Sequence, residues 1–215
     1  QNHFLNISKY HSVIKLLPLT LVLNILTKEI RINFSKYHYI HVFEEKIRFD
    51  TLQKNNASVY SFIGLGSTAD ATMACLQSIL PMERQYTIRL KRYKDQAERF
   101  AKKWAKANYT FVIVDTNEQL LDNCDVLISA VTEMPDLFCA EDSKYPEGIL
   151  LVPIHTRGFQ NCDLFFDHVF ADDKGHVEKF KYFSQFKAFN ELSEVLLEKV
   201  HGRENNSQRI LAYNV

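Results

Sequence analysis

Apolar and polar residues alternate along the chain from residue 59 onward in blocks of two kinds. Short apolar runs rich in β-branched and aromatic side chains predict strands at residues 59–63, 86–90, 111–114, 125–131, 148–154 and 168–171. Between them, blocks with apolar residues at helical spacing predict helices at residues 69–80, 95–107 and 117–121. This alternation of strand and helix predicts an α/β protein with a Rossmann-type, doubly wound parallel sheet.

Residues 1–58 follow a different pattern. The run 13–26 is apolar, but polar residues and a proline interrupt it, so it is too short to span a bilayer. No cleavage motif of a signal peptide follows this run. Residues 30–34 and 37–43 are rich in β-branched and aromatic side chains and predict strands. We therefore expect residues 1–58 to form part of a smaller, incomplete α+β unit.

The composition limits the classes of function. With 215 residues, 46% hydrophobic and 24% charged, the chain suits one large domain, or one domain and an incomplete second. Lysine plus arginine and aspartate plus glutamate number 26 each, so no net charge attracts the protein to nucleic acid or a membrane. Four widely spaced cysteines indicate reduced, buried thiols in a cytoplasmic protein, not a metal site. Because the chain starts at Gln1 and stops within an apolar run, we expect part of a longer protein.

A glycine turn joins the first predicted strand to the first helix. The pattern Gly-x-Gly-x-x-Ala falls on Gly64, Gly66 and Ala69. Gly64 can adopt the angles of a tight turn, Gly66 has no side chain to keep a pyrophosphate from the backbone, and Ala69 lets the helix pack closely on the strand. The first amides of the helix, at Ser67, Thr68 and Ala69, would point at the phosphates. The pattern favours dinucleotide binding, and the alternative is a turn with a structural role only.

The end of the second strand indicates which dinucleotide binds. An acidic residue there would accept a hydrogen bond from the ribose 2′-hydroxyl of NAD, whereas basic residues accommodate the 2′-phosphate of NADP. Lys91 and Arg92 occupy this position, and no carboxylate occurs before Asp95. They predict a preference for NADP(H), with NAD(H) as the other possibility, since a guanidinium can bind phosphate with two hydrogen bonds. The alternatives are a solvated basic turn or, on this neutral chain, a nucleic-acid patch.

The ends of the fourth and fifth strands supply the remaining candidates. Ala130, Val131 and Thr132 are small enough to let the backbone line the cofactor. His155 follows the fifth strand, where nicotinamide and substrate should meet, and it can exchange a proton near neutral pH. It is our catalytic candidate; the alternative is a hydrogen-bonding loop residue. Arg157 could bind a substrate carboxylate or a cofactor phosphate, or cap the loop.

Taken together, these segments resemble the ornithine cyclodeaminase and mu-crystallin family. The matching stretches are residues 62–69, 87–92, 124–130, 191–196, 202–203 and 209–213. The run 152–159 is most similar to the tyramine oxidase subgroup of this family. The resemblance implies a Rossmann domain that binds NAD(P)(H), a smaller domain for dimerisation and substrate binding, and a homodimer. Activities in the family include cyclising deamination of ornithine, alanine dehydrogenation and reduction of cyclic imino acids, and some members bind the cofactor with little or no turnover.

From the resemblance we expect a partial dimerisation and substrate domain at residues 1–58, the NAD(P)-binding domain at 59–190, and a helix and segment at 191–215 that return to the first domain. The expected function is that of an NAD(P)-dependent oxidoreductase acting on an amino acid, an amine or a cyclic imine. The alternative is an NADP(H)-binding accessory or ligand-binding protein without chemistry. It is favoured by three departures: the family's aspartate after the fifth strand is absent, its substrate-binding lysine and arginine have no match, and the family chain continues further.

Overall fold

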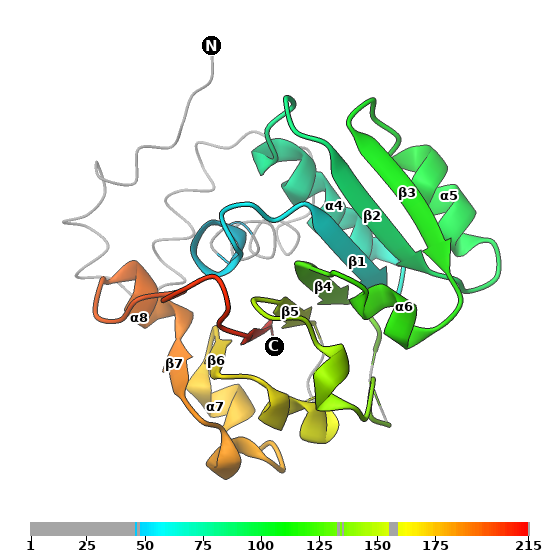
Figure 1. The fold of residues 1–215 in the computed structure, drawn as a ribbon. Helices are drawn as coiled ribbons and strands as arrows, with labels where there is room; N and C mark the ends of the chain where they lie inside the picture. Colours follow the sequence, from blue (N-terminus) through cyan, green and yellow to red (C-terminus); the bar gives the residue numbers. More distant parts are fainter. Residues whose placement is uncertain (1–45, 47, 133, 135, 155–158, 215) are drawn as a thin grey trace.

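The computed structural model describes residues 46, 48–132, 134, 136–154 and 159–214. The strands predicted between residues 30 and 43 and the candidates His155 and Arg157 lie outside these residues. The described part is an α/β structure built on one sheet, which Figure 1 shows as a ribbon. Within this part, no helix has the length and apolar character needed to cross a membrane.

The sheet has eight strands, all parallel, in the order β3-β2-β1-β4-β5-β8-β6-β7. In chain order the strands are β1 (Val59–Ile63), β2 (Tyr86–Lys91), β3 (Tyr109–Val114), β4 (Val126–Ser129), β5 (Leu150–Pro153), β6 (His168–Ala171), β7 (Phe189–Glu191) and β8 (Ile210–Tyr213). The prediction of a doubly wound parallel sheet is confirmed. The domain boundaries stay a prediction.

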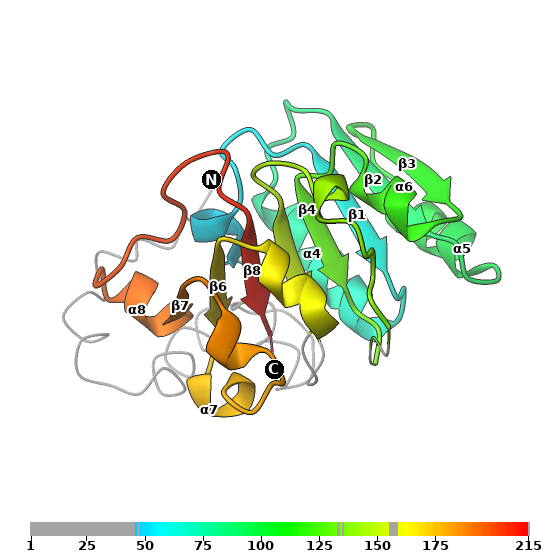
Figure 2. The ribbon, with the colours of Figure 1, turned by 60° about the horizontal axis from the view of Figure 1, so that its bottom comes forward.

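Two of these strands, β7 and β8, are absent from the predicted set. β8 lies inside the sheet, where Ile210 pairs with Leu150 of β5 and with His168 of β6 (Figure 2). All four residues of β8 are buried, as expected for a parallel strand covered on both faces. The run is only four residues long, and its partners are distant in sequence, so local periodicity gives no signal for its pairing.

The helices agree with the predicted positions, with one shorter than predicted. They are α4 (Ser67–Ile79), α5 (Gln96–Lys103), α6 (Asn117–Leu121), α7 (Lys174–Val177) and α8 (Leu192–Leu196), with 3-10 turns η2 (Asp142–Lys144), η3 (Gln160–Phe165) and η4 (Phe183–Gln185). The helix predicted at 95–107 ends at Lys103, because Trp104 leaves helical geometry and donates its indole N–H to Asp70 over 2.7 Å.

Side chains from the two faces of the sheet form two apolar cores. Neighbouring residues of a strand point to opposite faces, so Ile128 belongs to one core and Leu127 to the other. The first core is closed by α4 and α5, for example through Met73 and Phe100, and the second by α6 through Leu120. The ribbon accordingly has helices on both sides of the sheet (Figure 1).

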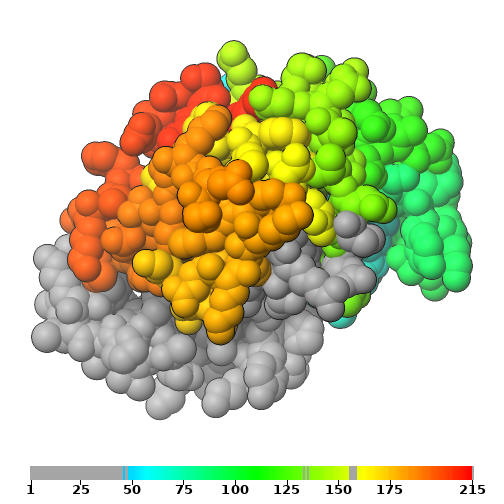
Figure 3. Space-filling model, turned by 90° about the horizontal axis from the view of Figure 1, so that it is seen from below, coloured from blue at the N-terminus to red at the C-terminus, as the bar shows by residue number. Residues whose placement is uncertain are grey.

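Because every strand is parallel, all strands end at one edge of the sheet, called here the carboxyl edge. Ligands of such folds bind outside this edge. The segments that begin there include Gly64 after β1, Arg92 after β2, Ala130 after β4 and Ile154 after β5. Seen from below, residues near 175–190 project from the surface of the molecule (Figure 3). The predicted cofactor-binding residues therefore follow strands that end at a common edge.

Candidate functional site

The turn between β1 and α4 requires glycine at Gly64. Its φ is +80°, a left-handed conformation that other residues rarely adopt. A Cβ at this position would lie 2.5 Å from the carbonyl oxygen of Ala130, so the turn packs directly on the segment after β4. Ala130 N also donates to Ile63 O over 2.8 Å. The two segments after β1 and β4 are therefore locked together at the carboxyl edge.

Gly66 stands in a different environment. It is the N-cap of α4, with a φ of −90°, and a Cβ there would meet nothing within 4 Å. No side chain caps the helix at this position, and the first helical hydrogen bond runs from Asp70 N to Gly66 O. The amides of Ser67, Thr68 and Ala69 are therefore the helix-start donors that have no partner within the helix. Open space in front of such donors suits an anion.

An acidic residue, Asp70, lies in the first turn of α4 and bears on the charge of this site. Its carboxylate accepts a hydrogen bond from Trp104 Nε1 over 2.7 Å and forms an ion pair of 2.9 Å with Lys103. The cation of Lys103 offsets the negative charge that would otherwise oppose a bound phosphate. Ala69, one residue earlier, is fully buried, so α4 packs closely on β1.

The basic turn after β2 is already engaged by carboxylates. Arg92 donates from Nε to Asp115 over 2.7 Å and from Nη1 to Glu98 over 2.6 Å, with its side chain 46% exposed. The hydrogen bond to Asp115 raises the pKa of Arg92 above its ordinary value. Lys91 donates to the backbone oxygen of Asp115. The pairing of Lys91 with Val114 in the sheet brings these residues together, and the sequence pattern does not reveal it.

The segment after β4 forms the other side of the turn. Ala130 and Val131 are half-buried and Thr132 is exposed. Ser129, the last residue of β4, pairs with Ile63. Its hydroxyl is buried and has no hydrogen-bond partner within the described part of the chain. Gly66, the amides of α4 and this hydroxyl together form a site that fits the pyrophosphate of a dinucleotide.

The described residues flank the segment that contains His155 without including it. Ile154 N donates to Ser129 O over 2.8 Å on one side of residues 155–158. On the other side, Phe159 N donates to Asp163 and to the hydroxyl of Tyr213, each over 2.7 Å. The assignments of His155 and Arg157 stay predictions.

Asp163 is a buried ionisable residue that sequence reasoning does not single out. It is 1% exposed, and burial raises its pKa from 3.8 to about 7. Tyr213 donates its hydroxyl to Asp163 Oδ1 over 2.6 Å, and burial raises the pKa of Tyr213 far above its ordinary value. An aspartate within the apolar run 162–166 is the one sequence signal that could have drawn attention to it.

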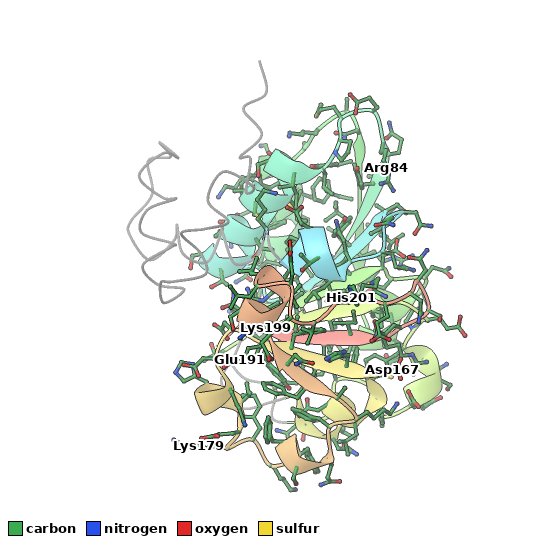
Figure 4. The ribbon with its side chains drawn as sticks, turned by 90° about the vertical axis from the view of Figure 1, so that its left-hand side faces the viewer. Arg84, Asp167, Lys179, Glu191, Lys199 and His201 are labelled. Atoms are coloured by element: carbon green, nitrogen blue, oxygen red, sulfur yellow. The ribbon has the colours of Figure 1, made fainter. Side chains whose placement is uncertain are left out.

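A separate open cavity of about 520 Å³ lies away from the glycine turn. Its lining consists of Thr51, Val195, Glu198, Val200, His201, Gly202 and Arg203. In Figure 4, His201 and Lys199 lie on this side of the molecule, on the loop that follows α8. None of the predicted site residues lines this cavity.

Comparison with known proteins gives a curated relative and several solved structures, whereas no family model matches. The nodulation efficiency protein NfeD of Rhizobium meliloti is 24% identical over 128 residues, which are 56% of this chain and 40% of that protein. The Δ1-pyrroline-2-carboxylate reductase of Thermococcus litoralis, in complex with NADH and L-proline, matches with a TM-score of 0.69 and 15% identity over 83% of this chain and 59% of that chain. A probable ornithine cyclodeaminase from Bordetella pertussis Tohama I gives 0.68 and 13% over 83% and 60%. The fold is that of the ornithine cyclodeaminase and mu-crystallin family.

An archaeal alanine dehydrogenase dimer with bound NAD shares this ornithine cyclodeaminase fold. Its TM-score is 0.65, with 16% identity over 82% of this chain and 57% of that chain. The resemblance predicted from the sequence is therefore confirmed for the fold. This chain spans about three fifths of the length of these structures and two fifths of the curated relative. Structures with this fold bind NADH or NAD, and the NADP preference predicted from Lys91 and Arg92 is a separate question.

Proposed function

We propose that this chain provides the nucleotide-binding part of an NAD(P)-dependent oxidoreductase that acts on an amino acid, an amine or a cyclic imine. The supporting observation is the open Gly66 position in front of the α4 amides at the carboxyl edge. Proteins with the same fold include a reductase that binds NADH and L-proline and a dehydrogenase of alanine that binds NAD. The dimer in that dehydrogenase supports the further proposal that this protein is a homodimer.

In this proposal the dinucleotide lies across the ends of β1, β2 and β4. The amides of Ser67, Thr68 and Ala69 donate to the pyrophosphate, which approaches the backbone at Gly66. The segment 130–132 lines the cofactor on its other side. When bound, NAD(P)H exchanges a hydride with the carbon that bears the substrate nitrogen. His155 then holds or moves the proton that accompanies this exchange.

The proposed cofactor is NADP(H), with NAD(H) accepted more weakly. Arg92 and Lys91 would bind the 2′-phosphate. Because Arg92 already pairs with Asp115 and Glu98, the phosphate must replace at least one carboxylate. Asp115 is also placed where it could accept a hydrogen bond from the 2′-hydroxyl of NAD. The preference therefore depends on the competition between phosphate and Asp115 for one guanidinium.

Cofactor titration tests the binding part of this proposal. We expect wild-type protein to bind NADPH more tightly than NADH, and Arg92→Ala to lose about tenfold in NADPH affinity with NADH affinity unchanged. Arg99→Ala is the matched control, because Arg99 is an exposed arginine on α5 that pairs with Asp95 instead. Asp115→Asn should strengthen NADPH binding by freeing Arg92. An unchanged preference in Arg92→Ala would refute the role of the basic turn.

Gly66→Ala tests the pyrophosphate site itself. The added methyl group meets nothing within 4 Å in the protein, so we expect the melting temperature to be maintained. It would nevertheless occupy the space of the pyrophosphate, so affinity for both dinucleotides should fall by about tenfold or more. Wild-type affinity in this variant would contradict the proposed site.

Turnover tests the chemistry. We expect the full protein to oxidise NADPH in the presence of a cyclic imine, or of a keto acid and ammonia, and His155→Ala to lose this activity. Tight NADPH binding without turnover across a broad panel would instead support the non-catalytic cofactor-binding protein.

A further inference from the structure

Three segments far apart in the sequence meet at one buried hydrogen-bonded cluster. It consists of the Phe159 amide, the Asp163 carboxyl group of η3 and the Tyr213 hydroxyl of β8. The amide donates to both oxygens over 2.7 Å, and the hydroxyl donates to Asp163 Oδ1 over 2.6 Å. All three residues are at most 1% exposed. We call this cluster the Phe159 anchor.

Burial of these polar groups works against stability. Moving an aspartate out of water is unfavourable, which the rise of the Asp163 pKa to about 7 reflects. Leucine and phenylalanine at these two positions would fill similar space in an apolar core without that penalty. The two side chains converge on a single backbone amide, so their common effect is to fix Phe159.

The position of Phe159 in the chain gives this effect its meaning. Phe159 directly follows the segment that contains His155, and Ile154 on the other side is bound to β4 through Ser129 O at 2.8 Å. Tyr213 is itself fixed, since its carbonyl accepts from the buried Arg48 over 3.1 Å and the next amide, Asn214 N, donates to Pro153 O over 3.1 Å. Both ends of residues 155–158 are therefore tied to the carboxyl edge.

We propose that Asp163 and Tyr213 are positioning residues, which through the amide of Phe159 fix the end of the segment that holds the proton-transferring His155. This inference rests on the proposed function, in which His155 acts on substrate. A group that transfers a proton must lie within hydrogen-bond reach of the reacting atom, and a displacement of about 1 Å can lower a rate by about a hundredfold. Neither positioning residue touches substrate or cofactor.

The test compares two buried tyrosines in the full-length protein. Tyr213→Phe removes the anchoring hydroxyl but keeps the ring, which packs at 5.0 Å from Phe180. The matched control is Tyr145→Phe, because Tyr145 is equally buried in the same core and its hydroxyl donates to Cys139 O over 3.2 Å instead. Amide exchange at Phe159, kcat and KM for imine reduction, and NADPH affinity are measured for both variants.

For Tyr213→Phe we expect exchange of the Phe159 amide to accelerate about tenfold or more and kcat to fall about tenfold or more, with KM and NADPH affinity within about twofold of wild type. For Tyr145→Phe all four quantities should stay within about twofold. Equal kcat and equal Phe159 exchange in the two variants would overturn the inference.

A second pair of variants covers the case in which Tyr213→Phe does not fold. Asp163→Asn keeps an oxygen that accepts from Phe159 and Tyr213, whereas Asp163→Leu keeps only the volume. We expect Asn to retain kcat and slow exchange and Leu to lose both, and equal behaviour would refute the anchor. If wild-type protein has no turnover, the proposed function fails and the catalytic purpose of the anchor with it. The exchange comparison would then still decide whether Phe159 is anchored.

Discussion

Replacing Asp163 with asparagine should remove a pH dependence of the stability of this protein. The carboxyl group is buried at 1% exposure, and burial raises its pKa from 3.8 to about 7. Asparagine has nearly the same shape and keeps an oxygen that can accept the hydrogen bonds from Phe159 N and the Tyr213 hydroxyl. The substitution therefore removes the ionisation while conserving the contacts of the accepting oxygen.

The sign and size of the effect follow from the difference between the folded and unfolded pKa values. Between about pH 4 and about pH 7 the folded protein keeps a proton on Asp163 that the unfolded chain releases, so the free energy of unfolding falls as the pH rises. The stabilisation is complete below the unfolded pKa and is lost as the pH passes the folded value. Each pKa unit corresponds to about 1.4 kcal/mol, so wild-type protein should lose about 3 kcal/mol relative to Asp163→Asn from about pH 5 to about pH 8.

Urea unfolding at a series of pH values measures this difference. Asp167→Asn is the control, because the Asp167 pKa is shifted the other way. Burial alone would raise the pKa of Asp167, but hydrogen bonds from Arg209 N and Lys187 lower it overall. Its contribution is therefore present above the unfolded pKa, and wild type minus Asp167→Asn should stay constant over the same range. A constant difference for Asp163→Asn as well would refute the reasoning.

Three further substitutions have defined outcomes. Gly64→Ala should lower the free energy of unfolding by about 2 kcal/mol or more, because φ is +80° and the new Cβ lies 2.5 Å from Ala130 O; wild-type stability in a urea titration would contradict this. Thr116→Ala should lower it by about 1 kcal/mol through loss of the capping box of α6, with NADPH affinity unchanged. Arg203→Met should lower it by about 3 kcal/mol, since Arg203 donates to the carbonyls of Leu52, Gly148 and Gln208, and limited proteolysis should then cut the loop 198–209 faster; resistance equal to wild type would argue against that role.

Local patterns in the sequence were enough to predict most of the sheet. The six strands with apolar runs flanked by turns are present, and the glycine turn lies between β1 and α4 as expected. β8 could not be predicted, because a four-residue apolar run has no periodicity and its neighbours in the sheet come from distant segments. The helix at 95–107 was predicted too long because the contact of Trp104 with Asp70 is tertiary.

The candidate site divides in the same way. Gly64 and Gly66 could be found from sequence, because the turn and the helix start that need them are local. The carboxylates around Arg92 could not, since Asp115 and Glu98 reach it only through the register of β2 and β3 and the placement of α5. The Phe159 anchor has no sequence signature, because its members are 4 and 50 residues apart and meet only in the folded core.

The insertion of β8 between β5 and β6 also affects how the protein is made. During synthesis β6 and β7 emerge from the ribosome well before residues 210–213, so β5 and β6 each have an unpaired edge until β8 arrives. Such edges can pair with other chains, and the nascent protein is therefore most prone to aggregate at this stage. The two parts of the sheet can join only after translation has passed residue 213, which makes assembly of this half of the sheet essentially post-translational and a natural point for chaperone assistance.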